Sequence, residues 1–489
     1  MTEVLRIPEE WASCTLGDIV EFLDNERVPV NENMRNKRIA GKPQSALYPY
    51  YGANGQVGWI DDCIFDEPLV LLAEDGGFFD VIGKVAYRIE GKTWVNNHAH
   101  VLRPLPGINL GYVHYALNAM SLMPFVSGTT RLKLNQGNAQ RIPIALAPQN
   151  EQKRIATIVE KLLGDLRIAK NSLQNAPNLM KRFRQSVLLK AFHGGLTEQD
   201  SNDEPAEKLL GRISEERRKK WEEGLRSKGK DLRKYKYKDY EFVPMVEQFK
   251  LPETWIWVRL GMLIESMKNG IYKSAEYYGS GIPCLRMYNI EGGKIVWKDI
   301  KMMNLSDAEV EEYGLNENDI LLNRVNSREL VGKAAVIPPG LGNVVFESKN
   351  IRIRIWKNLV EPNYISFFLQ TKFAREQIEL ECKQTVGMAT VSQEDINQWL
   401  IPLPPLNEQR RIIRLVEELF VQSDQVEDRI ENGLKDINDL VRAILSKAFH
   451  GELVPQDAND EPASILLERI RAQHATTFNK RSQTQLKLE

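Results

Sequence analysis

Several features that would place this chain in a familiar class are scarce or missing. Its 489 residues contain only four cysteines, Cys14, Cys63, Cys284 and Cys382, and no two of them have CxxC spacing. Cysteines so few and so scattered indicate neither a disulfide framework nor a zinc knuckle. We therefore expect them to be small buried residues.

Long apolar runs are also missing. No stretch approaches the roughly 20 apolar residues that a membrane span needs, and residues 1–6 lack the charged-then-apolar pattern of a signal sequence. We expect a cytoplasmic protein that does not bind membranes. With 42% hydrophobic residues, a chain of this length can form more than one core, so we expect two to four domains.

An excess of positive charge, the usual mark of a nucleic-acid-binding chain, is absent, since the formal net charge is -1. The charge is nevertheless unevenly placed. Twelve Lys and Arg residues but only five acids lie between Arg212 and Lys238. This stretch fits a solvated linker helix and a phosphate-contacting arm equally well.

What the sequence does contain is a tandem repeat. Lys190–Ile213 and Lys447–Ile470 match at seventeen of twenty-four positions without a gap. Upstream, PQNEQKRI from Pro148 pairs with PLNEQRRI from Pro405 at the same displacement, and a shared Pro, Trp, Leu and Gly pattern opens each half near Trp11 and Trp255. Such a repeat indicates a duplicated architecture.

The duplicated frame encloses two inserts that show no comparable similarity to each other, about residues 25–141 and 269–400. Short β-type runs at 82–89, 320–325, 334–337 and 351–356 predict a mixed α/β domain in each insert. Because the repeated motifs are retained while the two inserts between them have diverged, we favour two domains that recognise different ligands.

Each NEQ motif opens a pattern of apolar residues at heptad spacing, which is typical of a coiled-coil seam. Helices from these motifs to Gly194 and Gly451 would have roughly 44 residues and a length of about 66 Å. Pro177 predicts a kink in the first helix. Because a duplication gives an approximate two-fold axis, we expect the helices to pair antiparallel and to set the distance between the two domains. The predicted seam residues are Val159, Leu162, Leu166, Leu173, Met180, Phe183, Val187, Val416, Leu419, Val426, Ile430, Ile437, Leu440 and Ile444.

The inserts also carry polar loops rich in the residue types that read DNA. Arg pairs with guanine and Asn or Gln with adenine, each contributing about 1 to 3 kcal/mol of discrimination, and Lys, Thr and glycine amides suit phosphate. For any one residue an ordinary turn or surface role is the alternative. The candidates are Tyr51, Asn54, Asn97, His98, Thr130, Arg131, Lys133, Lys268, Asn269, Tyr272, Arg286, Asn289, Arg324, Asn326, Ser327, Arg328 and Thr385.

Signals for chemistry within the chain are weak. A phosphate-binding loop at Gly91-Lys92-Thr93 would need glycine where Ala86 stands. His98 and His100 could bind a metal, but without partner ligands nearby in the sequence a hydrogen-bonding role is the simpler interpretation. Glu347-Ser348-Lys349 resembles part of a nuclease site and has no Asp-rich partner. His193 and His450 repeat, yet a cation or donor before glycine suits a helix end. We predict no catalytic centre and no metal site.

From Pro8 to the end of the second repeat, the chain resembles the specificity subunits of type I restriction-modification systems. The NEQ-R-I openings, the long helices, the AFHG endings, and the segments LRMYNI and NDILLNRVNS occur in that family's order. The resemblance implies two target-recognition domains at 1–148 and 249–405, conserved helical regions at 149–213 and 406–489, and a basic linker at 214–248.

The resemblance further implies a non-catalytic subunit that recognises a split, asymmetric site on double-stranded DNA, one half per insert. Expected partners are two modification subunits, which methylate adenine with S-adenosylmethionine, and restriction subunits, which use ATP and Mg. The chain itself should bind no cofactor. The fold class predicted is α+β, with two mixed α/β domains separated by helices in an antiparallel coiled coil. A scaffold that joins proteins without touching DNA is the alternative binding function, which the near-neutral charge favours slightly.

Overall fold

The computed structural model describes residues 7–128, 131–237, 250–385 and 387–473. The chain forms two compact units. The first contains Met1–Asn175 and Ile430–Glu489, and the second contains Ala176–Arg429. Each unit therefore combines one insert with the first part of one long helix and the last part of the other.

The lobe of the first unit is built on two four-stranded sheets. One has the order β2-β9-β6-β7 (Val20–Phe22, Ala99–Pro104, Leu69–Ala73, Ala86–Ile89). The other has the order β4-β3-β8-β5 (Gly55–Ile60, Tyr48–Gly52, Lys92–Val95, Phe65–Asp66). β1 (Ala12–Thr15) pairs with β10 (Pro143–Leu146). The helices are α1 (Leu16–Ile19), α2 (Glu32–Ile39), α3 (Leu110–Asn118) and α4 (Gln136–Gln140).

The lobe of the second unit repeats this plan. Its four-stranded sheet has the order β12-β21-β17-β19 (Ile264–Asn269, Asn350–Ile355, Ile320–Asn323, Ala334–Val336), and β11 (Ile256–Arg259) pairs with β24 (Leu400–Leu403). A three-stranded sheet has the order β16-β13-β20 (Lys301–Met303, Tyr278–Leu285, Val345–Phe346). Smaller sheets join β14 (Ile290–Glu291) to β15 (Lys294–Ile295), and β18 (Val325–Asn326) to β23 (Met388–Thr390) and β22 (Lys383–Thr385). The helices are α7 (Leu260–Leu263), α8 (Asp307–Tyr313), α9 (Pro362–Phe368), α10 (Lys372–Glu381) and α11 (Gln393–Gln398).

The two inserts thus share a topology in spite of their unlike sequences. In each lobe a central, fully buried strand, β6 or β17, lies between two antiparallel neighbours, and a parallel pair, β3–β8 or β13–β20, belongs to the next sheet. The predicted mixed α/β domains are confirmed, as are strands in all four predicted runs. In the first run only Ala86–Ile89 is a strand.

The long helices have the predicted length. α5 runs from Gln149 to Phe192 and α12 from Leu406 to Phe449, 44 residues each. Both are followed by glycines with positive φ, 71° at Gly194 and 73° at Gly451, a backbone conformation that favours glycine after a helix end. α5 continues through Pro177 without a break, so the proline does not interrupt it, and a kink there stays a prediction.

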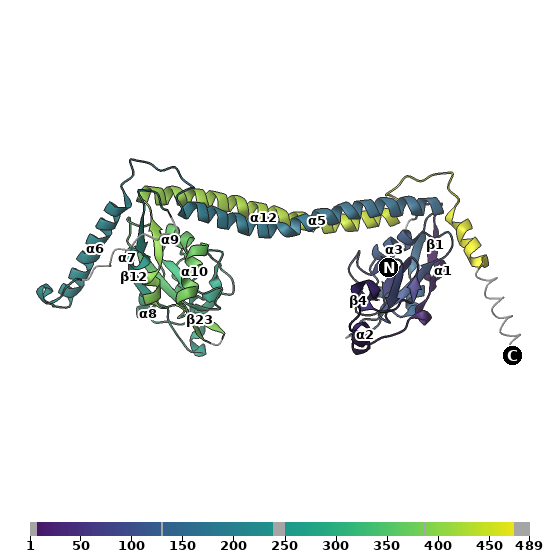
Figure 1. The fold of residues 1–489 in the computed structure, drawn as a ribbon, viewed down its shortest axis with the longest axis horizontal. Coiled ribbons are helices and arrows are strands. Elements are labelled where there is room, and N and C mark those ends of the chain that lie inside the picture. Colours follow the sequence, from purple (N-terminus) through teal and green to yellow (C-terminus); the bar gives the residue numbers. More distant parts are fainter. Residues whose placement is uncertain (1–6, 129–130, 238–249, 386, 474–489) are drawn as a thin grey trace. The chain divides into compact units, whose positions relative to one another are not determined.

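Within each unit the two helices pair antiparallel (Figure 1). In the first unit Leu173 lies against Gly433, and Lys170, one turn earlier, donates to Asn438 at 3.1 Å. In the second unit Arg184 forms ion pairs with Asp424 at 2.6 Å and Glu427 at 3.1 Å. The antiparallel coiled coil predicted from the heptads is therefore observed.

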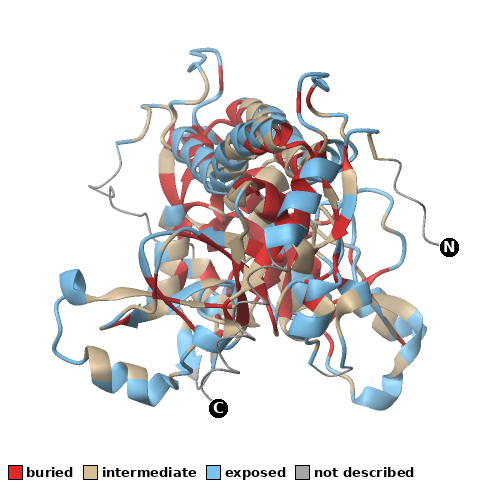
Figure 2. Cartoon of the chain, turned by 90° about the vertical axis from the view of Figure 1, so that its right-hand side faces the viewer, coloured by how far each residue is buried: buried red, intermediate tan, exposed pale blue. Residues whose placement is uncertain are grey.

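The predicted seam is wrong at three positions. Phe183, Val426 and Leu440 are 38%, 39% and 49% exposed, whereas Phe420 and Leu445 are buried in the cores of their lobes. Near both of its ends each helix packs on a lobe as well as on its partner, so the buried face departs from a strict heptad stripe. Figure 2 shows much of the surface of the paired helices as exposed and the sheet strands as buried.

The NEQ motif of the first helix joins segments from opposite ends of the chain. Glu151 is buried and accepts hydrogen bonds from Trp11 Nε1 at 3.0 Å and Gln456 Nε2 at 2.7 Å. Three residues later, Arg154 forms an ion pair with Asp460 at 2.6 Å. The loop after α12 thereby closes the first unit.

The second unit contains the same joint, made by the other copy of each motif. Glu408 accepts from Trp255 Nε1 at 2.8 Å and from Gln199 Nε2 at 2.5 Å, and Arg411 pairs with Asp203 at 2.5 Å. Each helix start is thus held by the loop that follows the other helix. The repeated residues are retained because they build this exchanged joint twice.

Candidate nucleic-acid interface

The three candidate loops of the first lobe meet at one turn. The segment 74–77 follows β6, and three side chains from distant loops contact it. Asn54 Nδ2 donates to the Gly76 carbonyl at 2.9 Å, while His98 Nδ1 and Arg131 lie 2.8 Å and 3.1 Å from Asp75 Oδ1. Because β6 is buried on both faces, the turn sits on a rigid support. The structure therefore gathers residues that are 77 positions apart (131 − 54 = 77) into one surface.

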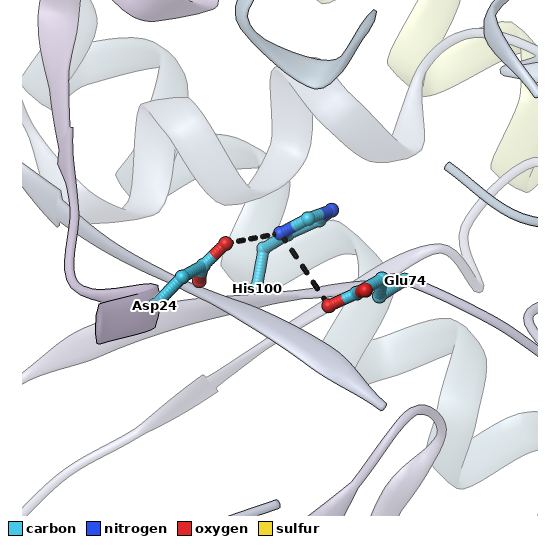
Figure 3. A group of neighbouring side chains, drawn as sticks. All are labelled: Asp24, Glu74 and His100. Carbon is cyan, nitrogen blue, oxygen red and sulfur yellow. Dashed lines mark hydrogen bonds and ion pairs between the residues drawn. The ribbon is translucent and has the colours of Figure 1, made fainter. Parts of the chain in front are cut away.

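Beneath this surface lies a buried polar cluster, which we call the acidic node and define by Asp24, Glu74 and His100 (Figure 3). Arg27 contacts both carboxylates, at 3.4 Å and 2.7 Å, and Lys133 reaches Glu74 at 3.0 Å. Burial alone would raise the pKa of Glu74, but the hydrogen bonds from Arg27 and Lys133 outweigh it and hold the pKa below its usual value. The node therefore fixes the position of Lys133 in the candidate surface.

Among the described residues, the acidic node is also a group of side chains of the kinds that bind metal ions. Its possible ligand atoms all lie within 4.8 Å of one another. His100 Nδ1 lies 2.6 Å from Asp24 Oδ2, and its Nε2 faces the Leu134 carbonyl at 2.8 Å. Both ring nitrogens of His100 thus face oxygen acceptors, while Arg27 and Lys133 already donate to the Glu74 carboxylate. His98 points to a different carboxylate, so the two histidines make separate hydrogen bonds, and His100 lies in a strand rather than in a loop.

The candidate loops around Arg286 and Arg324 meet at the segment 347–350, which precedes and begins β21. Glu347 accepts from Arg286 Nε at 3.0 Å and from the Met287 amide at 2.9 Å. Asn323 Nδ2 donates to Asn350 Oδ1 at 3.1 Å. Glu347, the acid of the nuclease-like triplet, is therefore engaged in positioning Arg286 and its turn.

Arg324 stands out in this cluster. It follows β17 directly, and its amide donates to the Lys349 carbonyl at 2.8 Å. Its Nε is buried and, within the described part of the chain, has no hydrogen-bond partner, while one terminal nitrogen lies 3.4 Å from the Ser348 carbonyl. A desolvated donor without an acceptor is costly, about 1 to 3 kcal/mol. The Nε atom itself is too buried to meet a ligand, but the residue as a whole is only partly buried, so Arg324 is kept as a candidate reading residue.

Two candidate residues are corrected by the structure. Asn289 and Asn326 are 2% and 6% exposed. Asn289 donates to the carbonyls of Val296 and Lys298, and Asn326 donates to Asn323. Their amide groups hold turns and are not accessible to a base edge.

The other candidates lie at or near the lobe surfaces. Thr130 and the side chain of Thr385 lie outside the described residues. Lys268 forms an ion pair with Glu312, and Asn269 accepts from Gln393. The exposed candidates are Asn54, Asn97, Arg131, Lys133, Asn269, Tyr272 and Arg328, and the partly buried ones are Tyr51, His98, Lys268, Arg286, Arg324 and Ser327.

Sequence reasoning missed the role of the two segments that organise these surfaces, and it noted Glu347-Ser348-Lys349 only for its likeness to part of a nuclease site. Asp75-Gly76-Gly77 has the composition of a turn, but nothing in the sequence says that three loops converge on it. Ser348-Lys349-Asn350 carries no comparable signal. The basic helix α2, with Arg35 over the Tyr50 ring at 4.8 Å, was also not singled out.

The same topological position carries opposite chemistry in the two lobes. The residue after β6 is Glu74, which belongs to the acidic node, whereas the residue after β17 is Arg324, which belongs to a cluster of asparagines. A common scaffold therefore presents two different sets of hydrogen-bonding groups.

Comparison with known proteins places this architecture in a family. The family model described as type I restriction modification DNA specificity domain matches residues 8–176 and 252–436, which together cover most of the chain. The chain belongs to this family of type I restriction-modification specificity subunits. None of the helices among the described residues has the length and hydropathy of a membrane span.

Individual relatives agree. The chain is 27% identical over 428 residues to the EcoKI specificity subunit of Escherichia coli K12, covering 84% of this chain and 82% of that one. It is 24% identical to the EcoDI specificity subunit of Escherichia coli, with 98% of each chain covered.

Solved structures show the same fold. A chain from a structure of type I R-M complex assembly and conformational transition aligns with TM-score 0.60 and 17% identity, over 91% of this chain and 99% of that one. The HsdS subunit of Thermoanaerobacter tengcongensis aligns with TM-score 0.50 and 15% identity, over 91% and 98%.

Proposed function

We propose that this chain is the DNA-reading subunit of a type I restriction-modification complex and that each lobe reads one half of a split, asymmetric site. The observation that carries the proposal is the pair of lobes with one topology and unlike surface chemistry. Arg324 with its asparagine neighbours suits bases that offer acceptors, whereas the surface over the acidic node offers Asn54, His98, Arg131 and Lys133. Different groups on a common scaffold would read different base sequences.

The paired helices would serve two purposes in this function. At about 1.5 Å per residue, 44 residues extend about 66 Å, enough to set a fixed gap between the two half-sites. Large apolar side chains also remain exposed on the helices, among them Ile168, Leu179, Leu189 and Val421. Exposed apolar surface of this kind suits a protein partner, and we assign it to two modification subunits.

Chemistry would belong to the partners. The modification subunits would methylate adenine with S-adenosylmethionine, and restriction subunits would use ATP and Mg, while the chain itself would bind no cofactor and catalyse no reaction. The engagement of Glu347 and of the acidic node in contacts within the chain supports this division. The chain would act in the cytoplasm, where its DNA is.

Sequencing of methylated bases in cells that express this chain with its modification subunit tests the proposal. We expect methylated adenines in one bipartite motif with a constant unspecified gap, and loss of that methylation when the chain is deleted. Methylation in a continuous motif, or unchanged methylation without the chain, would contradict it.

A further inference from the structure

α6 (Ala206–Ser227) is a helix whose two halves have different surroundings. Leu209 and Ile213 are buried in the core of the second lobe, and Lys220 forms an ion pair with Glu265 at 2.5 Å. Beyond Lys220 the helix leaves this support. In Figure 1 it projects from the side of the lobe that carries α7 and β12, and its free end lies away from α12.

The free end is a folded element, which we call the basic tip and define as residues 224–237. Gly229, with φ 69°, reverses the chain, and the Lys230 amide closes the turn on the Leu225 carbonyl at 3.0 Å. A 3-10 turn follows at Leu232–Lys234, and Tyr237 then packs on Trp221 with ring centroids 5.4 Å apart. The tip therefore presents its charges from a defined surface.

The charge of the tip is concentrated and of one sign. It contains six cations and the single acid Asp231, a net charge of +5 (6 − 1 = 5) in a chain whose net charge is -1. The cations on the preceding turns are matched, since Arg218 pairs with Glu222 and Lys219 with Glu216. In the tip, Arg226 pairs with Glu222 at 3.7 Å and Arg233 with Asp231 at 3.3 Å. Lys228, Lys234 and Lys236 form no ion pair within the described part of the chain. The six cations are Arg226, Lys228, Lys230, Arg233, Lys234 and Lys236.

We propose that the basic tip binds the phosphodiester backbone of duplex DNA beside the half-site read by the second lobe. This inference rests on the proposed function for the position of the DNA. Lysines and arginines that neutralise phosphates release counterions, which gives affinity without sequence preference, and such contacts fix the register of the base-reading loops. The tip supplies the positive charge that the chain as a whole lacks.

Salt dependence of binding is the direct test. The full-length chain is purified with its modification subunit, and its affinity for a random-sequence 40-base-pair duplex is measured over a range of salt concentrations. Replacing Lys228, Lys230, Lys234 and Lys236 together by Gln should lower the magnitude of the slope of log K against log salt by as much as ~3.6 if all four contact phosphates. The matched variant with Arg at the same four positions should keep the wild-type slope.

A second measurement locates the contact and separates it from the proposed function. Phosphate ethylation interference on a duplex with the methylated motif should reveal phosphates beside the second half-site whose effect disappears in the Gln variant, whereas those at the first half-site should be unaffected. The methylated motif itself should not change.

An unchanged salt slope overturns the inference. So does loss of the modification subunit from the Gln variant with unchanged DNA binding, which would make the tip a protein-binding element. Absence of any split motif would instead contradict the proposed function, and the slope measurement would still decide the tip.

Discussion

The buried glutamates of the two NEQ motifs show how single residues hold each unit together. Glu151 accepts one hydrogen bond on each carboxylate oxygen, from Trp11 and Gln456. Glu151→Gln leaves one acceptor oxygen and turns an amide NH2 group toward a second donor. An unmade buried hydrogen bond costs about 1 to 3 kcal/mol, so we expect this substitution to lower the unfolding midpoint of the first unit in urea.

The pH dependence gives a signature that packing alone would not produce. Burial raises the pKa of the Glu151 carboxyl above its ordinary value. Folding then favours the protonated carboxyl. The contribution of Glu151 to the free energy of unfolding is therefore greatest below the pKa that this carboxyl has in the unfolded chain, and it declines as the pH rises through the higher pKa of the folded chain. Glu151→Gln should remove that decline, while the exposed control Glu207→Gln should leave both midpoint and pH profile unchanged. Equal effects of the two substitutions would contradict the role given to Glu151.

Arg324 offers a test of base reading by one residue. Arg324→Gln should cost about 1 to 3 kcal/mol of discrimination, roughly a 5- to 150-fold loss, at one position of one half-site. The reciprocal variant, Arg131→Gln in the first lobe, should affect the other half only. Binding to a set of duplexes with single-base changes measures both, and a uniform loss over all positions in both halves would show that Arg324 contacts only phosphate or supports the fold.

Residue roles could be predicted from the sequence only where the contact is local. The helix-ending glycines, Gly194 and Gly451, follow from position and residue type, and both are confirmed. Asn289 and Asn326 have the composition of base-reading residues, but whether an amide faces solvent or a neighbouring turn depends on strands that are distant in sequence. The partnership of Trp11 with Glu151 and Gln456 could not be foreseen, because the repeat shows that these residues are retained and not which copies meet.

The elements that the sequence predicted best are those with a repeating pattern. α5 and α12 follow from heptad spacing over about four heptads, residues 159–187 and 416–444, together with the NEQ motif and glycine that bound each helix. The central strands follow from short apolar runs bounded by turns. The seam failed at Phe183, Val426 and Leu440, since a helix that also packs on a lobe buries a wider and shifting face. The convergence of loops on residues 74–77 and 347–350 follows from the order of strands in a sheet, which no local pattern contains.

At the scale of these elements, the length of the paired helices should set the gap in the recognised site. Inserting one heptad in each helix, after Ala176 in α5 and after Gly433 in α12, adds about 10.5 Å while keeping the heptad phase. Because successive base pairs are about 3.4 Å apart, we expect the gap in the methylated motif to increase by about three base pairs. A three-residue insertion, which breaks the phase, should instead abolish methylation. An unchanged gap after the heptad insertion would show that the helices do not set it.

For the whole molecule, the exchanged joints matter as much as the lobes. Each unit is completed by a segment from the other repeat, through Glu151 with Gln456 and through Glu408 with Gln199. The duplicated frame therefore ties the two lobes, whose surfaces we propose to read DNA, into one chain, and substitution within either surface should leave the frame intact. This independence is the property on which the proposed function depends.

The most direct measurement of that independence is the methylated motif of a chimaera. Residues 25–141 of this chain are replaced by the corresponding insert of another family member, the chimaera is expressed with the same modification subunit, and methylated adenines are mapped across the genome. The account predicts that one half of the motif changes to that of the donor while the other half and the gap are retained. A motif in which both halves change, or neither does, would contradict it.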